Sequence, residues 1–338
     1  MSNTTSTNLS SVRLLCRNIA MGFSIHRVFA PLIPLLRTNC EKFSAHEAPA
    51  KTASPVALLR NMWWAFRHHR RGDICHITGD VHYLLFALPF AHRVVTVHDL
   101  ITLHLGGSPF WRWLRRKIWL SWSLPLADKI VCISENTRRE LLEACNLDSK
   151  KVEVIYNPVD PIFQPSFKAF NAEQPRILHI GTNWNKNVDR TIEALKGIPC
   201  TFVVVGPLTE EQHMALQHAQ IVYENPIGLS DKEMKAQYEC CDLVSFPSLF
   251  EGFGMPIIEG QAVGRPILTS EIAPLTEVAA DTACYVNPQS VESIRQGFLR
   301  IIQNESYREE LVAKGFENVK RFAAPHIASQ YLALYHSL

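Results

Sequence analysis

Two glutamates eight positions apart, Glu251 and Glu259, carry the clearest chemical signature in this 338-residue sequence. Gly252 and Gly254 lie between them and free the backbone, while Pro256 suits the first turn of a helix. The pattern predicts a loose loop that ends at a helix N-terminus. Such a terminus presents unpaired backbone amides and the positive end of the helix dipole, and this combination favours a phosphate group.

Carboxylates beside a phosphate need a different partner, because like charges repel. An ionised carboxylate accepts hydrogen bonds at both oxygens, so sugar hydroxyls suit Glu251 and Glu259. A phosphate and a polyol together predict a sugar nucleotide as the ligand. The neighbouring sequence agrees with this geometry, since 241–246 predicts a short buried strand and 257–263 predicts a helix that ends at Gly264.

The string Glu-Gly-Phe-Gly-Met-Pro-x-x-Glu over residues 251–259 resembles the E-x7-E signature of retaining glycosyltransferases of family 4 (group 1), bacterial type, which have the GT-B fold. The resemblance implies that Glu251 holds hydroxyls of the donor sugar and that Glu259 holds the ribose. It also implies that the donor diphosphate meets the loop amides, so the expected nucleotide-binding residues include Gly252, Phe253, Gly254 and Met255. The donor is a substrate, and no separate cofactor is expected.

A second loop, Gly-Thr-Asn-Trp-Asn-Lys-Asn over residues 181–187, follows a predicted strand and precedes a predicted helix. Gly181 lets the backbone turn, and Lys186 could place a compact positive charge on a diphosphate. The family holds its donor diphosphate in a strand–Gly–x5–Lys loop of this kind. Many members have arginines where this chain has Thr182 and Asn185, which leaves Lys186 as the chief cation.

The remaining candidate residues are assigned from the resemblance. Asn-Pro-Ile-Gly-Leu-Ser-Asp over 225–231 resembles the loop that cradles the base, with Gly228 and Leu229 as the candidates. His98 ends a valine-rich strand in His-Asp-Leu, and this implies contact with the transferred sugar or the acceptor. Asp99 either orients the His98 imidazole or caps a turn. Gly79 and Asp80 either reach the acceptor or form a turn.

The catalytic assignment is therefore His98, Lys186 and Glu251. In the family, the leaving phosphate oxygen is thought to take the acceptor's proton on the same face of the sugar, so no separate general base is expected. The chain contains no Asp-x-Asp sequence. We therefore expect no metal site, with Lys186 and helix N-terminal amides neutralising the diphosphate instead.

Predicted strands alternate with predicted helices in the first half of the chain, and the alternation restarts in the second half. This pattern indicates an α/β protein with doubly wound parallel sheets. We predict two Rossmann-like domains facing across a cleft, the GT-B arrangement. Residues 1–160 would form an acceptor-side domain, 161–175 a proline-rich linker and 176–322 the nucleotide-sugar-binding domain. Residues 323–338 would form a crossover helix that returns to the first domain. The length suits two domains of this size.

The composition indicates which classes of partner and which cellular compartment to expect. Apolar residues make up 47% of the chain and charged residues 20%, and the net charge of +2 gives no reason to expect nucleic acid. Nine scattered cysteines indicate a reducing compartment. No apolar run approaches the length of a membrane span, and residues 1–11 lack the pattern of a signal peptide. These features predict a cytoplasmic protein, peripheral on the inner face of the cytoplasmic membrane if residues 109–123 contact lipid.

Residues 109–123 contain four tryptophans among four basic residues, and 63–71 adds Trp63 and Trp64 beside three arginines. Such a segment could lie in a membrane interface, which would suit a lipid-linked acceptor. It could equally be an ordinary helix with buried tryptophans and solvated arginines.

The predicted function is sugar transfer from a nucleotide-diphosphate sugar to a glycan or lipid-linked acceptor, in bacterial envelope polysaccharide or lipopolysaccharide synthesis. The alternatives are a GT-B sugar-nucleotide epimerase or phosphorylase and a non-catalytic glycan-binding module.

Overall fold

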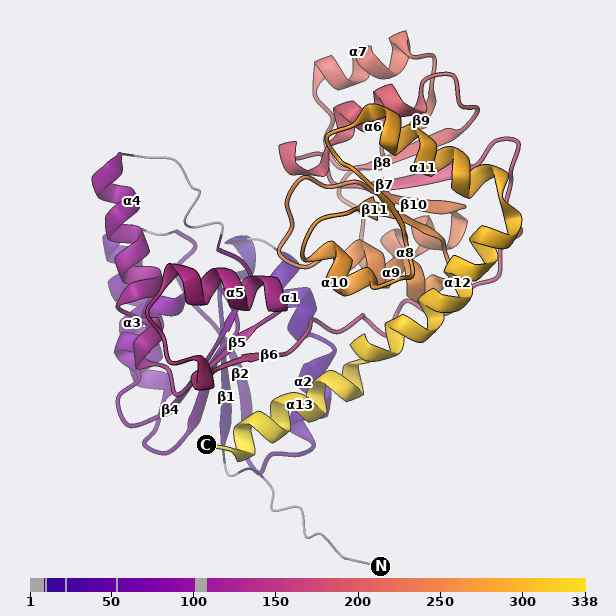
Figure 1. Cartoon of the computed structure of the whole chain (residues 1–338). Helices are drawn as coiled ribbons and strands as arrows, with labels where there is room; N and C mark the ends of the chain where they lie inside the picture. The colour runs from indigo at the N-terminus through magenta and orange to yellow at the C-terminus, as the bar shows by residue number, and fades with distance from the viewer. Residues whose placement is uncertain (1–8, 10, 22, 53, 101–107) are drawn as a thin grey trace, which may run out of the picture. The chain divides into compact units, whose positions relative to one another are not determined.

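A computed structural model describes residues 9, 11–21, 23–52, 54–100 and 108–338. The predicted N-terminal tail, apart from Leu9 and Ser11, lies outside the described residues. The chain folds into two compact units (Figure 1). Unit 1 comprises residues 1–158 and 324–338, and unit 2 comprises residues 159–323.

Unit 1 is built on a six-stranded, fully parallel sheet in the order β2-β1-β3-β4-β5-β6. The strands are β1 (Val12–Cys16), β2 (Phe43–Glu47), β3 (Ile74–Ile77), β4 (His92–Val97), β5 (Lys129–Cys132) and β6 (Val152–Val154). The chain places β2 on one side of β1 and the later strands on the other side, so the strand order changes direction between β1 and β3. In open parallel sheets, ligands bind outside the carboxyl ends of strands at such a switch point.

Several helices of unit 1 begin at serine caps. Ser54, Ser108 and Ser134 each accept a backbone N–H in the first turn of α3, α4 and α5, and a proline follows two of them. The α-helices are α1 (Phe23–Phe29), α2 (Leu32–Arg37), α3 (Pro55–His68), α4 (Pro109–Arg116), α5 (Glu135–Ala144) and α13 (Ala324–His336). Short helical turns are η1 (Ile19–Met21), η2 (His82–Ala87), the π-helical η4 (Lys117–Ser121), η5 (Leu124–Leu126) and η6 (Ser149–Lys151).

The C-terminal helix α13 completes the core of unit 1. Its buried face packs against α1, α2 and the central strands. Tyr335 Oη lies 2.6 Å from His76 Nδ1, and the other nitrogen of His76 lies 2.8 Å from Thr96 Oγ1. Because these groups are buried, each needs the other as a hydrogen-bond partner. The polar network thus fixes the last helix of the chain against the middle of the first sheet.

Unit 2 contains a second six-stranded parallel sheet, in the order β12-β11-β10-β7-β8-β9. Its strands are β7 (Arg176–Ile180), β8 (Thr201–Val205), β9 (Val222–Glu224), β10 (Leu243–Phe246), β11 (Ile267–Ser270) and β12 (Cys284–Val286). Its α-helices are α6 (Val188–Leu195), α7 (Glu210–His218), α8 (Asp231–Cys240), α9 (Met255–Val263), α10 (Leu275–Ala279), α11 (Val291–Gln303) and α12 (Glu305–Val319), with short turns η7 (Trp184–Lys186) and η8 (Lys320–Phe322). The switch point of this sheet falls between β7 and β10.

The fully parallel α/β prediction is confirmed in both sheets. Three strands were not predicted: β2, β9 and β12 are short, and β2 and β9 contain no buried residue. The segment from Arg17 to Arg27 contains η1 and most of α1. Residues 28–36 are helical, with a break between α1 and α2.

The segment predicted as a linker, 161–175, makes fixed contacts within unit 2. Arg265 is buried and donates to the carbonyl oxygen of Ser166 over 2.9 Å. Lys168 pairs with the buried carboxylate of Asp242. These contacts order the segment as part of unit 2.

Candidate functional site

The carboxyl ends of β7 and β10 form the switch point of unit 2, and the two glycine-containing loops lie there. Parallel pairing joins these strands through Ile177, Leu178 and His179 of β7. The loop after β7 carries Gly181 and Lys186, and the loop after β10 carries Glu251. Strand order therefore brings together two segments that lie about 65 positions apart in the sequence.

The loop after β7 turns sharply because two residues adopt left-handed backbone conformations. Gly181 has φ +88°, and a Cβ at this position would lie 3.1 Å from side-chain carbons of Lys186. Glycine therefore permits the lysine side chain to fold across the backbone. Asn187 has φ +61°, and its buried side-chain amide donates to the carbonyl oxygens of Pro247 and Pro288. These two bonds fix the end of the loop against the neighbouring connections.

Lys186 and Glu251 form the central contact of the site. Lys186 Nζ donates to Glu251 Oε1 over 2.6 Å and also lies 4.7 Å from the centre of the Phe246 ring. The two side chains are only 19% and 13% exposed. Asn185 supports the carboxylate loop by donating to the carbonyl oxygen of Phe250. One ligand at this point would meet both a cation and a hydrogen-bond acceptor.

The second loop places backbone, rather than side chains, at the site. Gly254 caps α9 with φ +111°, and a Cβ there would lie 2.7 Å from Leu275 Cδ2. The ring of Phe253 is buried and meets the ring of Phe322 edge-on at 5.8 Å. Phe253 can therefore offer a ligand only its backbone amide. The same holds for Gly252 and Gly254, which have no side chain. Met255 begins the helix and is partly exposed.

Glu259 lies in the second turn of α9 and is held from α8. Its carboxylate accepts a hydrogen bond from Tyr238 Oη. The remaining predicted pair, Gly228 and Leu229, lies farther along the same sheet edge, in the loop after β9. Asn225 ties that loop to the end of β8 through bonds of 2.7 Å to the carbonyl oxygens of Val204 and Gly206.

Three residues of this region were not predicted from the sequence. Asn187 clamps the lysine loop, Tyr238 holds Glu259, and His179 lies buried beneath Lys186 with Nδ1 3.3 Å from Ser245 Oγ. Burial, followed by the nearby lysine charge, lowers the pKa of His179 to about 3. An asparagine directly before a helix was the only one of these features visible in the sequence, since the other two depend on packing between distant segments.

The four residues predicted on the acceptor side lie in unit 1, at the carboxyl edge of its sheet. Gly79 and Asp80 follow β3 at the switch point, where Arg17 Nη1 donates to Asp80 Oδ1 over 3.1 Å. His98 follows β4, and its Nε2 lies 2.9 Å from the carbonyl oxygen of Thr78. Burial lowers the pKa of His98 to about 4, so the imidazole is neutral near pH 7. The neighbouring Asp99 is partly exposed.

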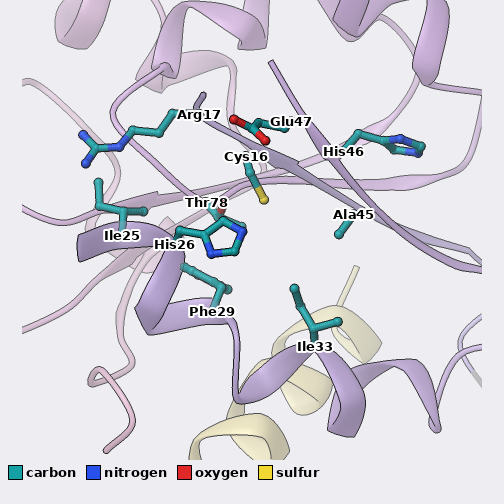
Figure 2. Close-up of a pocket in the computed structure, with 10 residues that line it drawn as sticks. All are labelled: Cys16, Arg17, Ile25, His26, Phe29, Ile33, Ala45, His46, Glu47 and Thr78. Carbon is teal, nitrogen blue, oxygen red and sulfur yellow. The ribbon is translucent and has the colours of Figure 1, made fainter. Parts of the chain in front are cut away.

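A cavity of about 170 Å³ opens at this switch point (Figure 2). Cys16 and Thr78 come from the ends of β1 and β3, and Phe29 of α1 closes the lower side of the cavity. The His26 ring points into the space in the figure, whereas the His46 ring points outward. Phe29 also contacts the His98 ring, with centroids 6.3 Å apart. The cavity and His98 therefore share a wall.

The described part of the chain lacks a cluster of side chains suited to a metal ion. There, His, Cys, Asp and Glu side chains nowhere gather in a group of three or more that could hold one. Among the same residues, no helix combines the length and the apolar character that a membrane crossing requires.

Comparison with known families matches both halves of the chain. The sequence model described as Glycosyltransferase Family 4 matches residues 10–163, and the one described as Glycosyl transferases group 1 matches residues 163–318. The O-antigen chain mannosyltransferase RfbU of Salmonella typhimurium is 26% identical, over 70% of this chain and 69% of its own length. The O-antigen chain mannosyltransferase B of Escherichia coli is 31% identical, over 64% of this chain and 62% of its own length, which is under two thirds.

Solved structures show the same fold at low sequence identity. Sucrose-phosphate synthase from Thermosynechococcus elongatus has a TM-score of 0.78 at 17% identity, covering 97% of this chain and 98% of that one. Anabaena Alr3699/HepE in complex with UDP and glucose has a TM-score of 0.77 at 13% identity, covering 97% and 100%. WaaG, described as a glycosyltransferase involved in lipopolysaccharide biosynthesis, has a TM-score of 0.71 at 13% identity, covering 94% and 99%.

Proposed function

Since the chain belongs to the group 1 glycosyltransferases of family 4 and has their GT-B fold, we propose that it is a retaining, metal-independent enzyme of cell-envelope synthesis. It would move a sugar from a nucleotide-diphosphate sugar to a glycan or lipid-linked acceptor in polysaccharide or lipopolysaccharide assembly. The names of two relatives, both O-antigen chain mannosyltransferases, support mannose as the transferred sugar and an O-antigen type of saccharide as the product.

The Lys186–Glu251 contact carries this proposal. It places a largely buried ammonium group and a carboxylate at the switch point of a doubly wound sheet, next to the N-terminus of α9. The diphosphate would bind Lys186 and the backbone amides of residues 252–254. Glu251 would then accept hydrogen bonds from the donor sugar, and Glu259 from the ribose. Gly228 and Leu229 would contact the base.

The acceptor would bind on unit 1, against Gly79, Asp80 and His98. A carbonyl oxygen can only accept, so the contact with Thr78 requires that Nε2 of the neutral His98 carry the proton. Nδ1 is then a hydrogen-bond acceptor available to a sugar hydroxyl. In this role His98 orients a hydroxyl group, and Asp99 would support the ring.

Transfer would proceed with retention and without a separate base, as the family resemblance implies. The acceptor hydroxyl oxygen would attack the anomeric carbon on the face from which the diphosphate leaves. As the bond between the anomeric carbon and the phosphate oxygen breaks, that oxygen takes the acceptor's proton. Lys186 and the α9 N-terminus would stabilise the negative charge that develops on the diphosphate.

The donor is identified by a thermal-shift panel of GDP-, UDP-, ADP- and dTDP-sugars. A ligand that binds only the folded protein stabilises it by about 2.7 kcal/mol at 100 times its Kd. One nucleotide class should raise the melting temperature well above the others, and the matching sugar should then transfer in the presence of EDTA. A product of inverted anomeric configuration, or activity abolished by EDTA, would refute the proposed mechanism.

A further inference from the structure

Helix α3 in unit 1 presents large apolar side chains to solvent. Its buried residues are the small or polar Ala57, Asn61 and Ala65. On the opposite face, Leu59 and Trp63 are 63% and 61% exposed, and Val56 and Phe66 are also exposed. An ordinary surface helix buries its large apolar residues and exposes its polar ones. In α3 the partly buried Leu58, Met62 and Trp64 pack against the core, so the exposed apolar residues form a second apolar face that could meet an apolar partner.

Helix α4 repeats the pattern with more aromatic area. None of its residues is buried, and Phe110, Trp111 and Trp113 are between 49% and 60% exposed. Trp113 also contacts the half-exposed Trp122, with ring centroids 6.1 Å apart. The alternative interpretation of residues 109–123 required buried tryptophans. The tryptophans at positions 111, 113 and 122 are exposed, so they are not core residues. Trp119 alone turns inward and donates to the carbonyl oxygen of Asp80.

The two helices border one continuous part of unit 1. The turn η2 packs against both α3 and η4, the π-helical continuation of α4. Tyr83 of η2 accepts a hydrogen bond from Asn61 of α3 and meets the Trp119 ring at 5.1 Å. The same region exposes Phe86 and Phe90, and Phe90 lies beneath the guanidinium of Arg71. We call the exposed surface of α3, α4 and residues 86–90 the aromatic–basic face.

The charge of this region is far more positive than that of the rest of the chain. Residues 48–127 contain ten Lys and Arg, three Asp and no Glu, a local net charge of +7 in a chain whose total is +2. Of the three aspartates, Asp73 is buried against Arg13 and Asp80 pairs with Arg17. Arg60, Arg67 and Arg112 are exposed on the same two helices as the aromatic side chains.

We propose that the aromatic–basic face binds the surface of a bilayer that contains anionic phospholipids. Tryptophan and phenylalanine rings enter the headgroup region, and arginines around them meet the lipid phosphates. A second copy of the chain would bring two faces of like charge together, so charge complementarity favours the lipid. This inference does not rest on the donor site, because the face lies on other elements and binds without any nucleotide.

The test is co-sedimentation of the full chain with vesicles of phosphatidylcholine alone, or with about 30% phosphatidylglycerol, in low and high salt. We expect binding to the anionic vesicles, a blue shift in tryptophan emission, and weaker binding as salt screens the charges. Trp111→Ala combined with Trp113→Ala should reduce binding about tenfold or more. Phe167→Ala with Met214→Ala, two exposed apolar residues of unit 2, should leave it unchanged.

A second pair of variants separates charge from apolar contact. Each basic residue near an anionic membrane strengthens binding by about fivefold, so Arg60→Glu with Arg112→Glu should weaken it at least about 25-fold. Lys196→Glu with Lys232→Glu makes the same charge change on unit 2 and should have a far smaller effect. Equal losses in both pairs, or no binding to anionic vesicles at low salt, would overturn the proposal. The proposal would also be overturned if light scattering showed the parent protein as a dimer and the tryptophan variant, but not the other variants, as a monomer. That result would identify a second copy of the chain as the occupant of this face.

Discussion

Lys186 and Glu251 meet at 2.6 Å although they lie 65 positions apart in the sequence. Both were selected as site residues from their local motifs, and the fold places them in contact. The pair is only slightly exposed, so each side chain needs either the other or a ligand to satisfy its charge. A diphosphate would compete for the lysine and leave the carboxylate to accept sugar hydroxyls.

This exchange of partners leads to the first prediction. Lys186→Met should weaken binding of a nucleoside diphosphate at least about tenfold, because a charge-assisted hydrogen bond to phosphate contributes about 1.5–3 kcal/mol. Binding of the corresponding nucleoside should change little, since it lacks the phosphates. Isothermal calorimetry with the two ligands measures the difference. Equal weakening of both would show that the lysine acts only on the fold.

Glu251→Gln should behave differently from the lysine variant. The amide keeps the shape of the side chain but loses a charged hydrogen-bond acceptor, so sugar transfer should fall by about 100-fold while nucleoside-diphosphate binding is retained. The measurement is kcat/KM for transfer beside the Kd for the diphosphate. Transfer near the normal rate would remove Glu251 from the catalytic assignment.

Glu259 makes a separate prediction through its partner on α8. Glu259→Ala should weaken nucleotide binding by about tenfold, because the ribose loses an ionised hydrogen-bond acceptor. Tyr238→Phe removes the hydroxyl that holds this carboxylate and should cause a smaller loss of the same kind. Calorimetry with a nucleotide and with its 2′,3′-dideoxy form distinguishes the effect. If the alanine variant weakened both forms equally, the ribose assignment would be wrong.

At the scale of single residues, the sequence identified charged groups more readily than the groups that hold them. Lys186, Glu251 and Glu259 stand in recognisable motifs. The roles of Tyr238 and His179 depend on helix α8 packing beside α9 and on β7 pairing with β10. No local pattern records such pairings, so these residues could not be predicted.

At the scale of elements, α9 and the loop before it determine the geometry of the proposed donor site. Gly254→Ala places a methyl group 2.7 Å from Leu275 Cδ2 and also imposes a left-handed backbone on alanine. Gly197→Ala imposes a similar backbone, φ +75°, but meets nothing within 4 Å. The control should therefore lose about 1–2 kcal/mol of unfolding free energy, whereas Gly254→Ala should lose more and also lose nucleotide affinity. Chemical denaturation and calorimetry measure the two effects, and equal stability losses would contradict the steric argument.

The elements that could be predicted are those with strong local patterns. Serine caps begin α3, α5 and α8, and apolar runs mark β7, β8, β10 and β11. The edge strand β2 contains Ser44, His46 and Glu47 and gains its structure from pairing with β1. Its position as an edge strand, and therefore the location of the switch point, depends on tertiary pairing that the sequence pattern does not show.

At the scale of the whole molecule, each unit contains a neutral histidine in its core. Burial lowers the pKa of both His76 in unit 1 and His179 in unit 2 to about 3. Between about pH 3 and the unfolded pKa near 6.5, the unfolded chain binds more protons than the folded chain. The unfolding free energy should therefore rise with pH between about pH 3 and pH 6.5. Above about pH 6.5, these histidines should cause no further rise.

The corresponding measurement is the unfolding free energy from pH 4 to pH 7. Each buried histidine should contribute a slope of about 1.4 kcal/mol per pH unit below pH 6. A variant that replaces His179 with glutamine should show a shallower slope than the parent. Identical slopes in the two proteins would show that His179 titrates normally in the folded state.

The proposed function depends most on where the donor diphosphate binds, and a crystal structure with a bound nucleoside diphosphate measures this directly. We expect the two phosphates within hydrogen-bonding distance of Lys186 Nζ and of the backbone amides of residues 252–254, with the Lys186–Glu251 contact lengthened and Glu259 at the ribose. A nucleotide bound away from the carboxyl ends of β7 and β10, or a Glu251 side chain turned into solvent, would contradict the assignment.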